Sequence, residues 1–145
     1  MKKVLFLCTG NSCRSQMAEG FARAAAAPGI EIYSAGVEAH GLNPRAVAVM
    51  AELGVDLRQQ TSKTLAEIPA DEIDTLITLC GDAAERCPVF PGVVTREHWP
   101  LADPARAEGS EEAILEAFRS VRNELEKRVR DLLALAVSIR LKSDV

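Results

Sequence analysis

The sequence of 145 residues lacks any apolar run long enough to cross a membrane, because no stretch approaches the about 18 apolar residues that a transmembrane helix requires. We do not expect a secretory signal peptide at Met1-Lys2-Lys3, since only four apolar residues follow, fewer than the about seven that such a leader needs. We therefore expect a soluble, cytoplasmic protein that has no membrane among its partners.

An excess of charge of one sign is missing too. The 17 Lys and Arg are nearly balanced by 21 Asp and Glu, so the net charge of −4 indicates neither a nucleic-acid-binding surface nor disorder. The sequence contains no internal repeat, linker or low-complexity segment, and 48% of its residues are hydrophobic, which is enough for a buried core. The whole chain, residues 1–145, is therefore predicted to form a single domain.

Spacings typical of metal sites are absent among the two histidines and four cysteines. His40 and His98 have no partner at ligand spacing, so we interpret both as ordinary loop or edge residues. The cysteines follow C-x4-C and C-x6-C spacings instead of the C-x2-C pairs that preorganise zinc sites, which makes zinc the weaker alternative. In a reducing compartment, four thiols favour thiol chemistry over structural disulfides.

What the sequence does contain is a strand signal that leads straight into a reactive loop. The apolar run at residues 4–7 indicates a buried strand, and the segment CTGNSCRS, residues 8–15, follows it. Gly10 and Asn11 supply a permissive backbone for a tight turn, and residues 15–27 have the composition of a helix. The backbone N–H groups and the helix dipole of a strand, tight loop and helix start are predicted to form an anion-binding site.

This loop carries its own reactive groups. Arg14 offers a planar fork for two oxygens of a tetrahedral oxyanion, and Cys8 lies in the same positive field. We expect Cys8 to be largely thiolate near neutrality and to attack the bound oxyanion, with a buried, inert cysteine as the alternative. The predicted oxyanion-binding residues are Thr9, Gly10, Asn11, Ser12, Cys13, Arg14 and Ser15.

Strand and helix patterns alternate along the rest of the chain. Strands are predicted at residues 30–34 and 75–79 and after residue 95, and helices at residues 44–53 and 65–68. This alternation indicates an α/β fold with a largely parallel sheet, in which ligands bind at the carboxyl ends of the strands. Cys8 and Cys80 both follow such ends, so we expect them to meet at one sheet edge although 72 positions separate them.

Cys87 lies seven positions after Cys80, across a loop-like or weakly helical segment. Either thiol alone could pack as a small apolar side chain. As a pair that flanks a segment able to rearrange, beside a thiolate loop, they favour disulfide exchange. Asp103, in the turn Asp103-Pro104, is predicted either to donate a proton as a general acid or to serve as an ordinary turn or N-cap residue.

From Ser110 the chain is predicted to form one long amphipathic helix. We expect it to pack within the same domain, with packing on a partner chain as the alternative. Its apolar positions are Ile114, Phe118, Val121, Leu125, Val129, Leu132, Ala136 and Ile139.

Residues 8–20, CTGNSCRSQMAEG, resemble the phosphate-binding loop of the low-molecular-weight protein tyrosine phosphatases, and more specifically that of the thioredoxin-coupled arsenate reductases built on the same fold. The likeness extends to YSAG at 33–36, HGLNP at 40–44, TLCGDA at 78–83 and EHW at 97–99. It implies a three-layer fold with a central four-stranded parallel sheet flanked by helices.

The resemblance implies reduction of arsenate to arsenite, a step of arsenic detoxification, by a relay of three thiols. Cys8 would attack arsenate held by Arg14, and Asp103 would protonate the departing oxygen. Cys80 would then attack Cys8, and Cys87 would attack Cys80, after which thioredoxin would reduce the last disulfide. No cofactor is required by this scheme. Some members also bind potassium, which implies ligands at Asn11, Glu19, Ser34 and Thr61.

A phosphatase that hydrolyses phosphate monoesters through Cys8 is the alternative within the same resemblance, and a weak side activity of this kind is compatible with the loop. Against it as the main activity, Ala105 stands where the phosphatase branch carries tyrosine, and residues 37–41 offer no aromatic wall for a phenolic ring. An oxyanion sensor without turnover would need the loop but neither Cys80 nor Cys87.

Overall fold

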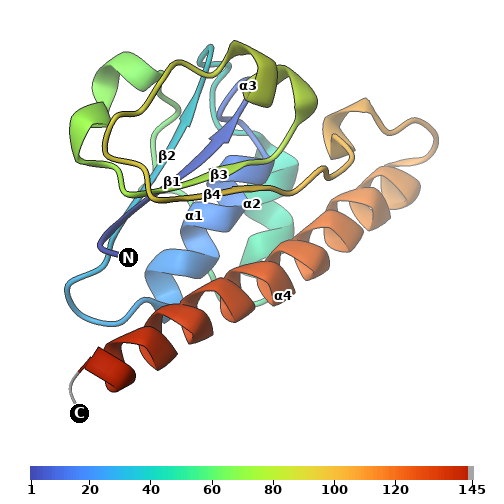
Figure 1. Ribbon diagram of the computed structural model, residues 1–145. Coiled ribbons are helices and arrows are strands. Elements are labelled where there is room, and N and C mark those ends of the chain that lie inside the picture. The colour runs from blue at the N-terminus through green and yellow to red at the C-terminus, as the bar shows by residue number, and fades with distance from the viewer. Residues whose placement is uncertain (144–145) are drawn as a thin grey trace.

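A parallel sheet of four strands in the order β2-β1-β3-β4 forms the middle of the molecule in the computed structural model (Figure 1). All three strand pairings are parallel, which confirms the predicted fold class. The strands are β1 (Lys3–Cys8), β2 (Glu31–Gly36), β3 (Thr75–Thr78) and β4 (Thr95–His98).

Helices cover both faces of this sheet, so the fold has three layers. The structure describes residues 1–143 of the chain and the side chains of all of these except 82 and 136–143. The helices are α1 (Arg14–Ala25), α2 (Pro44–Ala51), α3 (Gly81–Arg86) and α4 (Glu111–Ser143), with 3-10 turns η1 (Leu65–Glu67), η2 (Ala70–Glu72) and η3 (Pro104–Arg106).

Strand β1 is buried on both faces, and this is why its sequence is continuously apolar instead of alternating. Val4 and Phe6 pack in the core beneath α1, α2 and α4, whereas Leu5 and Leu7 pack in a second core beneath α3 and the 3-10 turns. Figure 1 shows α1, α2 and α4 together on one side of the sheet and α3 on the other. The central position of β1 therefore places Cys8 at the middle of the carboxyl edge.

Helix α2 begins and ends close to the predicted positions. The Asn43 side chain caps it by accepting hydrogen bonds from the N–H groups of Arg45 at 2.8 Å and Ala46 at 3.4 Å. The helix stops at Ala51, two residues before its predicted end, and Leu53 is exposed instead of buried. The chain then turns at Gly54, whose φ of +77° is the left-handed conformation that favours glycine.

Helix α4 packs within the domain, as predicted, along α1 and α2. Its predicted positions Phe118, Val121, Leu125, Val129 and Leu132 are all buried, while Ile114 is partly buried. The predicted positions 136 and 139 lie outside the described side chains. Within the part of the chain that the structure describes, no helix is both long and apolar enough to cross a membrane.

Replacing Leu125 by Ala removes a fully buried side chain by which α4 contributes to the main core. We expect the free energy of unfolding to fall by about 2–5 kcal/mol, because the substitution loses apolar burial and leaves a cavity. Leu135→Ala is the matched control on the same helix, since Leu135 is 53% exposed and should change stability by less than about 0.5 kcal/mol. Denaturant unfolding of both variants checks this, and equal losses would contradict the packing of α4.

The C-terminal end of α2 is joined to α4 by an ionic cluster. Glu52 accepts hydrogen bonds from the guanidinium groups of Arg119 at 2.8 Å and Arg122 at 2.7 Å. These bonds, first of all those from Arg119, lower the pKa of Glu52 from 4.5 to about 2.

A carboxylate with a lowered pKa stabilises the fold fully above its unfolded pKa and loses that contribution as the pH falls through the folded value. We therefore expect the difference in unfolding free energy between the wild type and Glu52→Gln to be constant above about pH 5. It should then shrink as the pH falls from 4.5 towards about 2. Unfolding curves over this pH range measure it, and a difference that does not depend on pH would show that the charge of Glu52 contributes nothing.

Candidate active site

The loop between β1 and α1 is organised by the buried side chain of Asn11. Its amide nitrogen donates hydrogen bonds to the hydroxyls of Ser15 at 2.8 Å and Ser34 at 2.9 Å. Its oxygen accepts from Gln16 Nε2 at 2.9 Å and from the backbone N–H of Lys63 at 2.8 Å. Asn11 has a φ of +46°, so the tight turn predicted for the loop is made at this residue.

Two glycines let other chain segments approach this loop closely. At Gly36, a Cβ would lie 2.2 Å from the carbonyl oxygen of Glu38 and 2.7 Å from the backbone nitrogen of Asn11, and neither backbone atom can move aside. At Gly10, a Cβ would lie 2.3 Å from Nδ1 of His40. Gly10 is therefore needed for the space it leaves to His40, and the left-handed turn falls on Asn11 alone.

The Cys8 thiol lies at the bottom of the loop, 3% exposed, and its Sγ is 2.8 Å from Oγ of Ser15. The direction of this hydrogen bond follows from its neighbour. Because the Asn11 amide nitrogen can only donate, Ser15 Oγ accepts from it, and the hydroxyl hydrogen remains available to donate to the sulfur. A hydroxyl donor aimed at sulfur is the arrangement that stabilises a sulfur anion.

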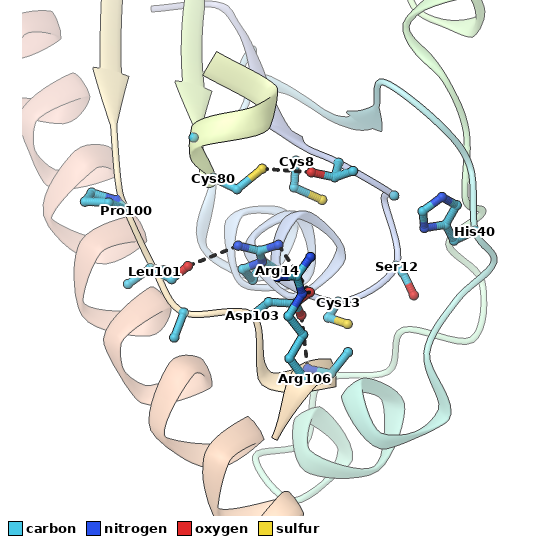
Figure 2. A pocket seen from close by; sticks show the side chains of 15 residues that line it. Cys8, Ser12, Cys13, Arg14, His40, Cys80, Pro100, Leu101, Asp103 and Arg106 are labelled. Atoms are coloured by element: carbon cyan, nitrogen blue, oxygen red, sulfur yellow. Dashed lines mark hydrogen bonds and ion pairs between the residues drawn. The ribbon is translucent and has the colours of Figure 1, made fainter. Parts of the chain in front are cut away.

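Arg14 is the first residue of α1, so its side chain extends from the positive end of the helix dipole. Its guanidinium is nearly buried, donates to the carbonyl oxygen of Leu101 at 3.0 Å and lies 3.7 Å from Oδ2 of Asp103. These contacts fix the guanidinium over the loop, next to Cys8 (Figure 2).

Asp103 is an N-cap residue, one of the two roles that the sequence left open, and its second carboxyl oxygen faces the anion loop. Its Oδ1 accepts from the backbone N–H of Ala105 at 3.0 Å and so caps η3. Its Oδ2 faces Arg14, and Arg106 Nε lies 3.9 Å from the same oxygen. A turn residue therefore also presents a carboxyl oxygen to the anion loop.

The anion loop, residues 9–15, forms the floor of a cleft of about 620 Å³ (Figure 2). The cleft includes Cys8, Arg14 and Asp103 as predicted, and also two cationic or titratable side chains that the sequence analysis did not place there. These are Arg106 and His40, whose Nε2 is 2.8 Å from Oε2 of Glu38. His40 lies in a loop, as predicted, and the close approach at Gly10 brings its ring to the rim of the cleft.

Cys80 reaches the same cleft from the end of β3, as predicted from the parallel sheet. Its Sγ is 3.1 Å from Oγ1 of Thr9 and accepts from the backbone N–H of Ala83 at 3.3 Å. Cys87 follows the other end of α3 and lines a separate cleft with Val89 and Val94. Burial raises the pKa of the Cys87 thiol. The structure therefore brings Cys8 and Cys80 together and leaves Cys87 apart from them.

Cys13, the fourth cysteine, is buried in the anion loop. Burial, and to a smaller extent the nearby carboxylate of Asp103, raises the pKa of the Cys13 thiol to about 11. Cys13 therefore remains protonated at neutral pH and contributes backbone to the loop. All four cysteines are free thiols, and among the described residues no three His, Cys, Asp or Glu side chains gather as metal ligands.

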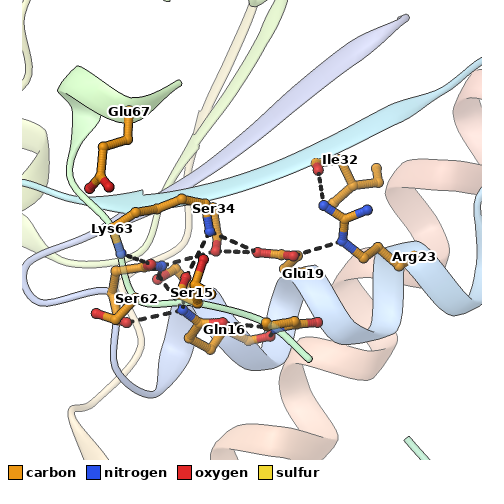
Figure 3. A network of polar contacts seen from close by, with 12 residues as sticks. Ser15, Gln16, Glu19, Arg23, Ile32, Ser34, Ser62, Lys63 and Glu67 are labelled. Carbon is orange, nitrogen blue, oxygen red and sulfur yellow. Dashed lines mark hydrogen bonds and ion pairs between the residues drawn. The ribbon is translucent and has the colours of Figure 1, made fainter. Parts of the chain in front are cut away.

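Of the residues predicted to bind potassium, Asn11 belongs to the anion loop, and Glu19 and Ser34 lie in a polar network beside it (Figure 3). The Asn11 amide donates to Ser34, and the Ser34 hydroxyl donates to Oε1 of Glu19 at 2.5 Å. Thr61 and Glu19 line one cavity of about 590 Å³, together with Lys63. The structure thus brings the four predicted residues into one polar network and adds a lysine that the sequence analysis did not single out.

The chain matches the family model of the low molecular weight phosphotyrosine protein phosphatases over residues 3–144, and it belongs to that family. Within the family, the arsenate reductase of Bacillus subtilis (strain 168) is 51% identical over 130 residues, which cover 90% of this chain and 94% of the relative. A solved structure described as an arsenate reductase in the phosphate binding state is 42% identical, has a TM-score of 0.80, and is matched over 92% of this chain and 98% of its own.

A thioredoxin-dependent arsenate reductase of Corynebacterium glutamicum is a more distant structural neighbour. It is 27% identical with a TM-score of 0.72, and the match covers 97% of this chain and 62% of that one.

Replacing Ser15 by Ala removes the hydroxyl group that lies 2.8 Å from the Cys8 sulfur and can donate to it. We expect alkylation of Cys8 by iodoacetamide at neutral pH to slow by about tenfold, the equivalent of one hydrogen bond to a charged group. Ser110→Ala is the control, because Ser110 caps α4 through the N–H of Ala113. Peptide mass spectrometry of a time course measures the rate, and an unchanged rate in Ser15→Ala would show that the hydroxyl does not activate the sulfur.

Proposed function

We propose that this protein is an arsenate reductase in which Cys8, Cys80 and Cys87 react in that order, so that the disulfide formed on the protein is transferred away from the oxyanion site. Backbone N–H groups of the anion loop and the guanidinium of Arg14 would hold the arsenate oxygens. The similarity to the arsenate reductase of Bacillus subtilis over 90% of the chain supports this substrate. Arsenate and phosphate are both tetrahedral oxyanions, so the neighbour in a phosphate binding state supports the same loop as the binding site.

In the first step, the Cys8 sulfur attacks arsenic and forms an S–As bond, while one oxygen leaves as water after taking up a proton. Asp103 is the proposed proton donor, since its Oδ2 is 3.7 Å from the arginine that would hold the substrate. Because an oxyanion would compete with Asp103 for Arg14, binding of arsenate would free this carboxyl group for proton transfer.

In the second step, the Cys80 thiolate attacks Cys8 Sγ, and the electron pair of the S–As bond remains on arsenic, which leaves as arsenite. The product on the protein is a disulfide between Cys8 and Cys80. This step is supported by the position of Cys80, which lines the same cleft as Cys8. The Cys80 sulfur lies 3.1 Å from Oγ1 of Thr9, the residue that follows Cys8 in the chain.

In the third step, Cys87 attacks Cys80 and releases Cys8 as a thiolate. Cys80 and Cys87 flank the 6 residues of α3, and seven helical steps between them place their Cα atoms about 10 Å apart, beyond the about 7 Å limit of a disulfide. Helix α3 must therefore unwind, which is inexpensive for a helix of 6 residues. The disulfide then lies beside Val89, which is 91% exposed, where a reductant has access.

Thioredoxin is the proposed reductant, because its dithiol supplies the two electrons that each turnover consumes. The likeness to the thioredoxin-dependent enzyme of Corynebacterium glutamicum supports this partner. Cysteine thiols provide all the reducing equivalents in the scheme, so it requires no cofactor, and it suits a reducing compartment such as the cytoplasm.

Phosphatase activity is a second function that one observation favours. Cys8, Arg14 and Asp103 surround the same cleft without help from Cys80, and these groups suffice to form and hydrolyse a thiophosphate. Ala105 and Arg106 line this cleft where an aromatic side chain would be needed to hold a phenolic ring, so we expect this activity to be weak.

The observation that carries the proposal is the placement of two thiols on the cleft and a third at the far end of a short helix. Replacing Cys80 or Cys87 by Ser tests it. Cys80→Ser should produce no arsenite, whereas Cys87→Ser should produce about one arsenite per molecule and then stop, because its oxidation ends at the disulfide between Cys8 and Cys80.

Arsenite release with arsenate and reduced thioredoxin measures this, and peptide mapping identifies the disulfide. Hydrolysis of an aryl phosphate is the internal control, and both variants should retain it at the wild-type rate because it needs Cys8, Arg14 and Asp103 but neither Cys80 nor Cys87. Repeated turnover by either variant would refute the relay.

A further inference from the structure

Behind the anion loop, a buried carboxylate is shared by two cationic side chains (Figure 3). Glu19 is 2% exposed, and Nε of Arg23 donates to it at 2.7 Å. The ammonium of Lys63 lies 3.6 Å from Oε1 of Glu19, the same oxygen that accepts from Ser34. The negative charge of Glu19 is therefore already matched by two positive charges.

Lys63 is also bonded to the loop through its backbone. Its N–H donates to Oδ1 of Asn11 at 2.8 Å, and its carbonyl oxygen accepts from Gly36 at 2.9 Å. Its ammonium donates to the carbonyl oxygen of Thr61 at 2.8 Å, and its side chain is only 18% exposed. A charged group is thus held within the polar network that supports Asn11.

The same contacts test whether the site fits a potassium ion. A hard monovalent cation needs several oxygen ligands at once. The carbonyl of Thr61 and Oε1 of Glu19 already face the lysine ammonium, and Oδ1 of Asn11 accepts two N–H donors. An added ion would place a third positive charge around one carboxylate, so the residues fit an ammonium better than they fit potassium.

We propose that the Lys63 ammonium serves as a built-in cation that supports the anion loop, so that this protein does not depend on potassium. Lys63 acts as a positioning residue, since it acts through Glu19, Ser34 and Asn11 and lies outside the cleft that contains Cys8. The inference uses the anion loop of the proposed function, but it does not require the thiol relay.

Two variants of Lys63 test the role of its charge, one that leaves space for an ion and one that does not. Lys63→Ala removes the charge and leaves space among the oxygens, so a potassium ion can replace the ammonium. Lys63→Met removes the charge but fills most of the same space. The anion loop should therefore lose the support of the ammonium, and potassium should not be able to replace it. Lys127→Ala is the control, because Lys127 is exposed on α4 beside a different cavity.

The test measures the affinity for inorganic phosphate and the melting temperature in potassium, sodium and choline chloride at equal ionic strength. The wild type and Lys127→Ala should have the same phosphate affinity in all three salts. Lys63→Ala should bind phosphate about tenfold more weakly in choline chloride, which is the usual effect of removing a side chain that acts through the residues around a bound ligand. Its phosphate affinity should recover in potassium chloride. Lys63→Met should remain weak in all three.

The proposal is overturned if wild-type affinity depends on potassium, if Lys63→Ala binds normally in choline chloride, or if potassium does not restore it. Should Lys63→Ala fail to fold, normal binding by Lys63→Met in choline chloride would overturn it equally. Phosphate binding needs no electron transfer, so failure of the relay would leave these results unchanged, and the two proposals fail separately.

Discussion

The hydrogen bonds of the Asn11 side chain are the constraint on which the active site depends. One carboxamide connects the loop to α1 through Ser15 and Gln16, to β2 through Ser34, and to the segment after α2 through Lys63. Because it is fully buried, each of its polar atoms would carry a desolvation cost if left without a partner. The left-handed backbone of Asn11 is therefore held in place by its own side chain, and the neighbouring Ser15 hydroxyl is oriented toward Cys8 as a consequence.

The protein combines this rigid loop with a weakly held helix. Cys8 and Arg14 lie at the junction of a central strand and a long helix, whereas Cys80 and Cys87 lie at the two ends of α3, which is only 6 residues long. Binding a tetrahedral oxyanion needs fixed donors, because mobile donors would have to be ordered on each encounter. Thiol exchange between distant sulfurs needs the opposite, since the chain between them must change shape. In the proposed relay, these two requirements would fall on different elements of the fold.

Much of this arrangement was predictable from local sequence. The apolar run of β1, the Asn43 cap and the buried positions of α4 follow from periodicity and capping, which depend on neighbouring residues only. The meeting of Cys8 and Cys80 also followed, because parallel strands end at a common edge. His40, Arg106 and Lys63 were not assigned to the site, since each reaches it through a contact between segments that no local pattern encodes.

The sequence by itself determined the strand-loop-helix unit and the chemistry of its thiol and guanidinium, because these depend on residue type and on spacings within one turn of the chain. Only the tertiary structure decided the strand order, the separation of Cys87 from the cleft and the position of the Lys63 ammonium against Glu19. The physical reason is that such contacts join residues 20 or more positions apart, and their geometry is set by how the layers pack.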